Sequence, residues 1–286
     1  MQQLDFEVWD VFTDTPFSGN PLAIVTGADG LSTEQMQTMA REFNLSETIF
    51  LMAPRDPNHT ARARIFFPTA EIPFAGHPTV GAALMLAGKN NLNHITLEEE
   101  AGVVPVEVLD GVARFQAPVV PFSHAVAIDP SLAAKALDIA VRDIGPHIIG
   151  VHEGGPRFLY VPVKTRDALR RARPLEPYWS DLIEAGGVDS AYLYSPEFDA
   201  RMFSPTAGVP EDPATGSASA LLASQLLVNG AIAEGDNHFE LTQGEDMGRP
   251  SQISLTITAQ NSAIKSVHVA GRAVQISSGR IRVPTC

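Results

Sequence analysis

Three residues of this 286-residue chain combine ionisable side chains with positions at the ends of predicted elements: Glu47, His77 and Asp212. Glu47 lies where a predicted helix gives way to a strand, His77 opens one apolar helix, and Asp212 precedes a second. Each position alone is typical of a surface glutamate, a hydrogen-bonded histidine or a helix-capping aspartate. Together they supply two carboxyls and an imidazole, a set suited to general acid–base catalysis.

Small residues occupy the starts of the same two helices: Gly76 in the first, and Gly216 and Ser217 in the second. The first turn of a helix has unpaired N–H groups and the positive end of the helix dipole, so it attracts anions. Small side chains let a ligand approach the backbone closely. We therefore predict that these three residues bind a substrate carboxylate. The alternative is that they form ordinary tight turns and caps.

Hydrophobic periodicity predicts the elements that position these residues. Ser32 to Gln35 has the form of a capping box, and the apolar stripe that follows predicts a helix ending near Asn44. A strand is predicted over residues 48–52, directly after Glu47.

Two segments, residues 78–87 and 215–228, are apolar on nearly every face and predict buried helices. Pro78 suits the first turn of the earlier helix, and Gly88 is expected to end it. The strand predicted over residues 95–99 runs into three consecutive glutamates, Glu98 to Glu100, which we interpret as a solvated strand end.

An internal repeat links the two buried helices. Residues 64–84 align without a gap onto residues 201–221, and 8 of the 21 aligned pairs are identical. The identical pairs are Arg64/Arg201, Phe66/Phe203, Pro68/Pro205, Thr69/Thr206, Ala70/Ala207, Pro73/Pro210, Ala83/Ala220 and Leu84/Leu221. A chance match of two Pro-rich loops is the alternative. The spacing predicts two related domains, residues 1–120 and 121–286, with the last strands able to pack back on the first domain.

Composition narrows the possible partners. The net charge of −13 disfavours binding to nucleic acid and to anionic membranes. The single cysteine, Cys286, fits a reducing compartment, and the first residues lack the pattern of a signal peptide. No apolar run is long enough to span a bilayer. We therefore expect a cytoplasmic protein that acts on a small molecule.

Motifs for common cofactors are missing from the sequence. It contains no P-loop, no dinucleotide-binding glycine motif and no zinc-protease motif. The closest pair of histidines, His147 and His152, has no clear third ligand nearby. We expect neither a metal nor an organic cofactor.

Three segments resemble the signatures of the phenazine-biosynthesis PhzF-like family. They are Asn44-Leu45-Ser46-Glu47-Thr48, Phe74-Ala75-Gly76-His77-Pro78-Thr79 and Asp212-Pro213-Ala214-Thr215-Gly216-Ser217-Ala218. The resemblance covers essentially the whole chain. It implies a diaminopimelate-epimerase-like α+β fold of two pseudo-symmetric domains, each a mostly antiparallel, barrel-like sheet around a central helix. It also implies an active site in the cleft between the domains and a homodimer.

The resemblance further implies an isomerase like the one that acts on trans-2,3-dihydro-3-hydroxyanthranilate, in which a glutamate moves a proton across one face of the ring. Carried over by motif, Glu47 is the acid/base, while His77 and Asp212 position the substrate and assist the proton. The small residues at the helix starts would hold the carboxylate through backbone N–H groups.

Two alternatives remain open. The first is an epimerase or other proton-transfer enzyme acting on an amino-acid-like substrate. Related epimerases and racemases use a pair of cysteines, but this chain has Ala75 and Pro213 near those positions, which argues against a two-thiol mechanism. The second alternative is a non-catalytic binding or scaffold protein that keeps the fold.

Overall fold

The structure, a computed structural model, describes residues 2–285, so Cys286 lies outside the described residues. Contacts within the chain define two compact units. Unit 1 comprises Met1–Pro118 and Val269–Cys286, and unit 2 comprises Val119–His268. The end of the chain therefore returns to the unit in which the chain begins.

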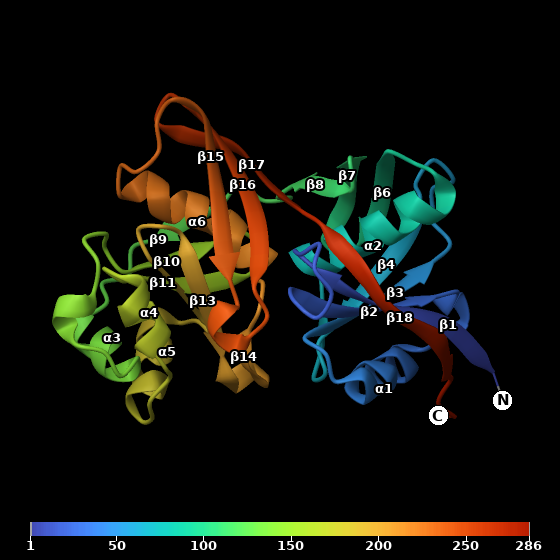
Figure 1. The fold of residues 1–286 in the computed structure, drawn as a ribbon, viewed down its shortest axis with the longest axis horizontal. Coiled ribbons are helices and arrows are strands. Elements are labelled where there is room, and N and C mark those ends of the chain that lie inside the picture. The colour runs from blue at the N-terminus through green and yellow to red at the C-terminus, as the bar shows by residue number, and fades with distance from the viewer. Residues whose placement is uncertain (1, 286) are drawn as a thin grey trace. The chain divides into compact units, whose positions relative to one another are not determined.

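Unit 1 is a mostly antiparallel sheet that surrounds one helix (Figure 1). Its elements are β1 (Gln3–Val11), β2 (Asn20–Thr26), η1 (Ala28–Gly30), α1 (Thr33–Phe43), β3 (Glu47–Met52), β4 (Ala61–Phe66), β5 (Glu71–Ile72), α2 (Gly76–Asn90), β6 (His94–Glu99), β7 (Gly102–Leu109), β8 (Val112–Gln116) and β18 (Ala273–Arg282). The strands pair in the order β18-β1-β2-β3-β4-β6-β7-β8.

The central helix α2 is buried because its residues are small or apolar all round. It contacts β1, β2, β3, β6, β7, β8 and β18. Gly81 permits this approach, since a side chain there would collide with Leu22 and Val11. No helix among residues 2–285 combines the length and apolar character needed to cross a membrane.

A second helix covers another part of the same sheet. α1 begins at the Ser32 capping box, as predicted, and ends at Asn44. Its buried residues Met36 and Met39 belong to a cluster that includes Phe50 of β3. Every residue of β3 is buried, as expected for a strand covered on both faces.

Unit 2 repeats this plan. Its elements are β9 (Phe122–His124), α3 (Pro130–Ala136), η2 (Val141–Asp143), β10 (Gly150–Glu153), β11 (Arg157–Pro162), α4 (Arg166–Arg171), α5 (Tyr178–Gly186), β12 (Ala191–Tyr194), β13 (Asp199–Ser204), η3 (Pro205–Ala207), β14 (Val209–Asp212), α6 (Gly216–Val228), β15 (Gly235–Gln243), η4 (Glu245–Met247) and β16 (Ser251–Gln260). β17 (Ala263–Gly271) contains the boundary between the units. The buried helix α6 contacts β9, β10, β11 and β16 (Figure 1).

The two units share one sequence of strand pairings. The pairs β1–β2, β2–β3, β3–β4, β4–β6 and β6–β7 are antiparallel, parallel, antiparallel, parallel and antiparallel. The pairs β10–β11, β11–β12, β12–β13, β13–β15 and β15–β16 follow the same order. The predicted α+β class, with a mostly antiparallel sheet around a central helix in each half, is confirmed.

Three boundary predictions needed correction. α2 starts at Gly76 rather than Pro78, and it continues past Gly88 to Asn90, because Asn91 adopts the left-handed conformation that ends the helix. Thr215 is the N-cap of α6 and not its first residue. The gap-free repeat alignment fits β4 and β13, but the N-caps Ala75 and Thr215 show that unit 2 has a loop three residues longer.

Candidate active site

Glu47 and His77 lie side by side in unit 1. Glu47 is the first residue of β3, and His77 is the second residue of α2. Glu47 Oε2 is 3.2 Å from His77 Nδ1, and the two residues are only 7% and 3% exposed. Gly76, which is also buried, precedes His77 on the helix. We call Glu47, Gly76 and His77 the unit 1 cluster.

The imidazole of His77 is neutral near physiological pH. Burial lowers the pKa of His77 to about 3, and a backbone hydrogen bond with Pro21 opposes the shift only in part. The Glu47–His77 contact is therefore that of a carboxyl group with a neutral imidazole and not an ion pair. A neutral imidazole can donate one proton and accept another, so it can relay a hydrogen bond next to an acid/base.

Pro21, whose backbone bonds His77, is the second residue of β2 and follows the loop between β1 and β2. Gly19 in that loop has φ +66°, and a side chain there would collide with the carbonyl oxygen of Val11. Glycine is therefore required for the chain to turn tightly into β2. This explains structurally why the sequence Ser18-Gly19-Asn20-Pro21 leads into the strand next to β3.

Asp212 lies in unit 2 at the end of β14, where it is buried. Its Oδ2 accepts a hydrogen bond from Thr215 Oγ1 at 2.6 Å. Gln243, the last residue of β15, donates to the Asp212 carbonyl at 2.7 Å and to Thr215 Oγ1 at 3.0 Å. The side-chain oxygen of Gln243, Oε1, accepts a hydrogen bond from Thr215 N–H at 3.1 Å. These bonds fix the chain that enters α6.

Gly216 and Ser217 form the first turn of α6, directly after Thr215. Gly216 is buried, and Ser217 is half-buried. We call Asp212, Gly216 and Ser217 the unit 2 cluster. The six predicted site residues thus fall into two clusters of three, each at the start of a buried helix.

Both buried helices begin without a side-chain cap. The N-caps Ala75 of α2 and Thr215 of α6 make no capping hydrogen bond through their side chains. The more peripheral helices α1, α3 and α4 are capped by Ser32, Asp129 and Thr165. Uncapped first-turn N–H groups beside small residues can receive an anionic ligand.

One residue that the sequence analysis treated as solvated lies against the start of α2. Glu99 is only 7% exposed, and its Oε1 is 2.7 Å from Thr79 Oγ1. The prediction of a solvated strand end was therefore wrong for Glu99. Strand alternation could have revealed it, because Glu99 shares the buried face of β6 with Ile95 and Leu97.

Two histidines of unit 2, His147 and His152, have structural partners. His152 Nδ1 is 2.8 Å from Ser224 Oγ, and its Nε2 is 2.6 Å from Gln225 Oε1. Burial lowers the pKa of His152 to about 4, so this side chain is neutral and connects β10 to α6. His147 pairs instead with Tyr194. Residues 2–285 contain no group of three or more His, Cys, Asp or Glu residues arranged to hold a metal.

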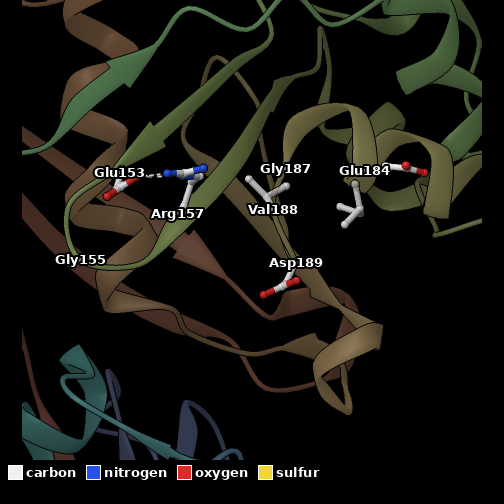
Figure 2. A pocket seen from close by; sticks show the side chains of 8 residues that line it. Glu153, Gly155, Arg157, Glu184, Gly187, Val188 and Asp189 are labelled. Carbon is white, nitrogen blue, oxygen red and sulfur yellow. Dashed lines mark hydrogen bonds and ion pairs between the residues drawn. The ribbon is translucent and has the colours of Figure 1, made fainter.

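An open hollow on unit 2 is a separate feature (Figure 2). It has a volume of about 490 Å³ and is lined by Glu153, Gly155, Arg157, Ile183, Glu184, Gly187, Val188 and Asp189. Arg157 Nε donates to Glu153 at 2.8 Å, and this bond and one from His124 lower the pKa of Glu153. The hollow contains none of the predicted site residues, and its excess of carboxylates disfavours an anionic substrate.

Comparisons with known proteins agree with the geometry. The family model described as phenazine biosynthesis-like protein, PhzC-PhzF, matches residues 9–279. An uncharacterised isomerase of Mesorhizobium japonicum is 38% identical over 98% of this chain and 99% of its own length. The trans-2,3-dihydro-3-hydroxyanthranilate isomerase of Pseudomonas aeruginosa is 35% identical over 96% of this chain and 98% of its own length.

A solved structure shares the whole architecture. The PhzF-family phenazine biosynthesis protein of Bacillus anthracis superposes with a TM-score of 0.88 at 25% identity, covering 99% of this chain and 100% of that one. The predicted diaminopimelate-epimerase-like fold is thereby confirmed.

Proposed function

Because this chain belongs to the phenazine biosynthesis-like PhzC-PhzF family and is an isomerase, we propose that it moves a proton within a small carboxylate-bearing substrate without a cofactor. The substrate class that we propose is a ring like that of trans-2,3-dihydro-3-hydroxyanthranilate, which the Pseudomonas aeruginosa relative is named for.

The observation that carries this proposal is the buried Glu47–His77 pair. A largely buried carboxyl group beside a neutral imidazole can take a proton from carbon and deliver a proton back after exchange with solvent. In unit 2, His147 and His152 are hydrogen-bonded within the framework, and the His124–Glu153 pair is partly exposed to solvent rather than buried.

In the proposed reaction Glu47 removes a proton from one ring carbon and returns a proton to another carbon on the same face. The double bond moves to the vacated position and gives an enol-amine. Its hydroxyl proton then moves to the amine-bearing carbon to give the keto tautomer, so that no atom is gained or lost. His77, which is neutral, lies with its Nδ1 3.2 Å from Glu47 Oε2 and limits where the carboxyl can move. One carboxyl serving one face favours a proton shift over inversion of a stereocentre.

The carboxylate of the substrate would be held at an uncapped helix start. Gly76, Gly216 and Ser217 place little or no side chain over the first turns of α2 and α6, and Asp212 orders the chain before α6 through Thr215. Backbone N–H donors bind a carboxylate without adding a positive side chain.

Deuterium uptake tests the proposal. The protein is incubated in D₂O with trans-2,3-dihydro-3-hydroxyanthranilate and a panel of small carboxylates, and uptake is followed by NMR. Wild type should incorporate deuterium at carbon, and Glu47→Gln should lose at least about 10³-fold in rate. Glu153→Gln, in the hollow of Figure 2, is the matched control and should keep full activity.

The remaining outcomes separate the alternatives. Uptake at a stereocentre with inversion would indicate an epimerase instead. Equal uptake by wild type and Glu47→Gln would refute the role of Glu47. Binding of a carboxylate that is unchanged by Glu47→Gln, without uptake from any candidate, would indicate a binding protein that keeps the fold.

A further inference from the structure

A chain of two hydrogen bonds joins Glu99 to the first peptide of α2. Thr79 Oγ1 is 2.8 Å from the carbonyl oxygen of Ala75 and 2.7 Å from Glu99 Oε1. The Thr79 hydroxyl has one proton, so it can donate to only one of these two oxygens. Both contacts are hydrogen bonds only if Glu99 is protonated and donates to Thr79, while Thr79 donates to Ala75.

The far end of this chain reaches the unit 1 cluster. The Ala75 carbonyl and the Gly76 N–H belong to one planar peptide group, so a bond that fixes the carbonyl also fixes the direction of the N–H. Gly76 N–H is one of the donors proposed for the substrate carboxylate, and His77 follows it.

We propose that Glu99 is a positioning residue that acts as a neutral acid, orienting the Gly76 N–H through Thr79 and the Ala75 carbonyl. This inference rests on the proposed function for its effect on catalysis. The hydrogen-bond geometry that supports it does not depend on the substrate.

The corresponding position of unit 2 supports this assignment. Glu99 ends β6, the strand that follows the buried helix α2, and Gln243 ends β15, the strand that follows α6. Gln243 also reaches back to the chain that enters its helix, donating to Thr215 Oγ1 and accepting from Thr215 N–H. A side-chain amide is a permanently neutral donor. In this position unit 1 therefore has an acid where unit 2 has an amide.

The surroundings of Glu99 favour the protonated form. Burial raises the pKa of Glu99 to about 8, and the hydrogen bond with Thr79 counteracts this only in part. Its Oε2 has no hydrogen-bond partner among the residues that the structure describes. The adjacent Glu98 has the opposite environment, because backbone N–H groups of Asp56 and Arg55 lower its pKa to about 2. Strand alternation thus gives two consecutive glutamates opposite properties.

No charged neighbour accounts for the raised pKa of Glu99. The ionisable side chains on the elements packed against β6 are His77 and Lys89 on α2, Arg62 and Arg64 on β4, and Glu107 on β7. Arg62 is the register partner of Glu98, so it and Arg64 lie on the face away from Glu99. Lys89 pairs with Glu7, Glu107 with Arg114, and neutral His77 lies beside Glu47. None of these groups contributes to the pKa shift of Glu99.

Ionisation of Glu99 should weaken substrate binding. The Thr79 hydroxyl proton would then turn to the carboxylate, the Ala75 carbonyl would keep only the longer bond from Thr79 N–H at 3.3 Å, and a negative charge would appear near the proposed carboxylate donors. We expect KM to rise above about pH 8 while kcat changes less, so that kcat/KM falls on the alkaline side.

The test compares wild type with Glu99→Gln, which keeps a neutral donor of the same shape. The first measurement needs no substrate: the ¹H–¹⁵N NMR signals of Gly76 and His77 are followed from pH 6.5 to 9.5. In wild type they should shift with a midpoint near pH 8, and in Glu99→Gln they should not. The second measurement is the pH profile of deuterium uptake, in which the variant should lose the alkaline fall.

Glu98→Gln is the matched control, since it changes the neighbouring carboxyl on the opposite face. It should keep both the NMR titration and the alkaline fall. Absence of a titration at Gly76 and His77 in wild type, or an identical titration in Glu99→Gln, would overturn the inference. The titration without deuterium uptake from any candidate would support the positioning of Gly76 and overturn the proposed function instead.

Discussion

The starts of α2 and α6 are held by similar hydroxyl bonds but by different side chains from the following strand. In both helices a hydroxyl four residues after the N-cap bonds the N-cap carbonyl: Thr79 bonds Ala75 at 2.8 Å, and Ser219 bonds Thr215 at 3.0 Å. In unit 2 the amide of Gln243 completes the arrangement with three further hydrogen bonds. In unit 1 the carboxyl of Glu99 occupies the corresponding place and, among the residues that the structure describes, hydrogen-bonds only Thr79.

This difference between an amide and a carboxyl shows how the two units of a repeated fold can take different roles. An amide keeps its hydrogen bonds at any pH, so the start of α6 is a fixed support for Asp212. A buried carboxyl changes state within the working range, so the start of α2 can respond to pH next to Glu47 and His77. The proton-transfer chemistry and the titratable support are therefore expected in the same unit.

The largest expected effect compares the acidic residue of each cluster. Glu47→Gln should reduce kcat by at least about 10³-fold, because it removes the acid/base itself. Asp212→Asn should reduce it only about tenfold, since an amide oxygen can still accept the bond from Thr215. Steady-state rates of deuterium uptake for the two variants give this ratio directly.

Equal losses in these two variants would break the comparison. They would mean that unit 2 supplies an acid/base of its own and that the chemistry is shared. Circular dichroism of both variants is the control that separates a catalytic loss from unfolding.

The second-largest effect is expected from a substitution that introduces an acidic side chain into unit 2. In Gln243→Glu the introduced carboxylate would face the Asp212 carbonyl, to which the amide now donates. A carboxyl whose folded pKa is raised keeps its proton in the folded protein while the unfolded chain ionises above about pH 4.3, so the folded state loses stability as the pH rises. The free energy of unfolding should therefore drop by about 1 kcal/mol at pH 5 and about 3 kcal/mol at pH 8.

Urea unfolding of wild type and Gln243→Glu at both pH values measures this change. Glu99→Gln supplies the opposite case. The Glu99 carboxyl ionises near pH 4.5 in the unfolded chain but only near pH 8 in the folded protein, so wild type loses stability between these values, and the variant should not. A loss in Gln243→Glu that is the same at both pH values would show that the amide serves only to fill space.

The sequence predicted the repeated fold well because the strongest signals are structural. Arg64 and Arg201, identical in the repeat, each pair with a glutamate on the neighbouring strand, Glu71 and Glu211. Each guanidinium also lies over a phenylalanine ring two residues along, Phe66 or Phe203. Such contacts constrain residue identity, so they survive as sequence matches.

The helices gave a weaker signal for the opposite reason. Alanine and leucine are common in any buried helix. Ala83 and Leu84 therefore match Ala220 and Leu221 without being structural equivalents, and the gap-free alignment does not show the longer loop of unit 2. The correspondence of Glu99 and Gln243 could not be found by identity, because the residues differ. It depends on strand pairing, which brings the end of β6 or β15 to the start of a helix.

The smallest expected effect concerns the two hydroxyls. Thr79→Val keeps the shape of the side chain but leaves the buried Glu99 hydroxyl without its acceptor, which should lower the free energy of unfolding by about 2 kcal/mol. Ser219→Ala removes a hydroxyl that bonds the Thr215 carbonyl and lies 3.5 Å from the Tyr192 hydroxyl, with no carboxyl beside it among the described residues, so about 1 kcal/mol is expected. Thr79→Ser, which restores the hydroxyl, should recover most of the loss. Urea unfolding at pH 6, where Glu99 holds its proton, measures the free energy of unfolding of all three variants. Equal losses for Thr79→Val and Ser219→Ala would mean that the hydrogen bond between Glu99 and Thr79 adds no stability.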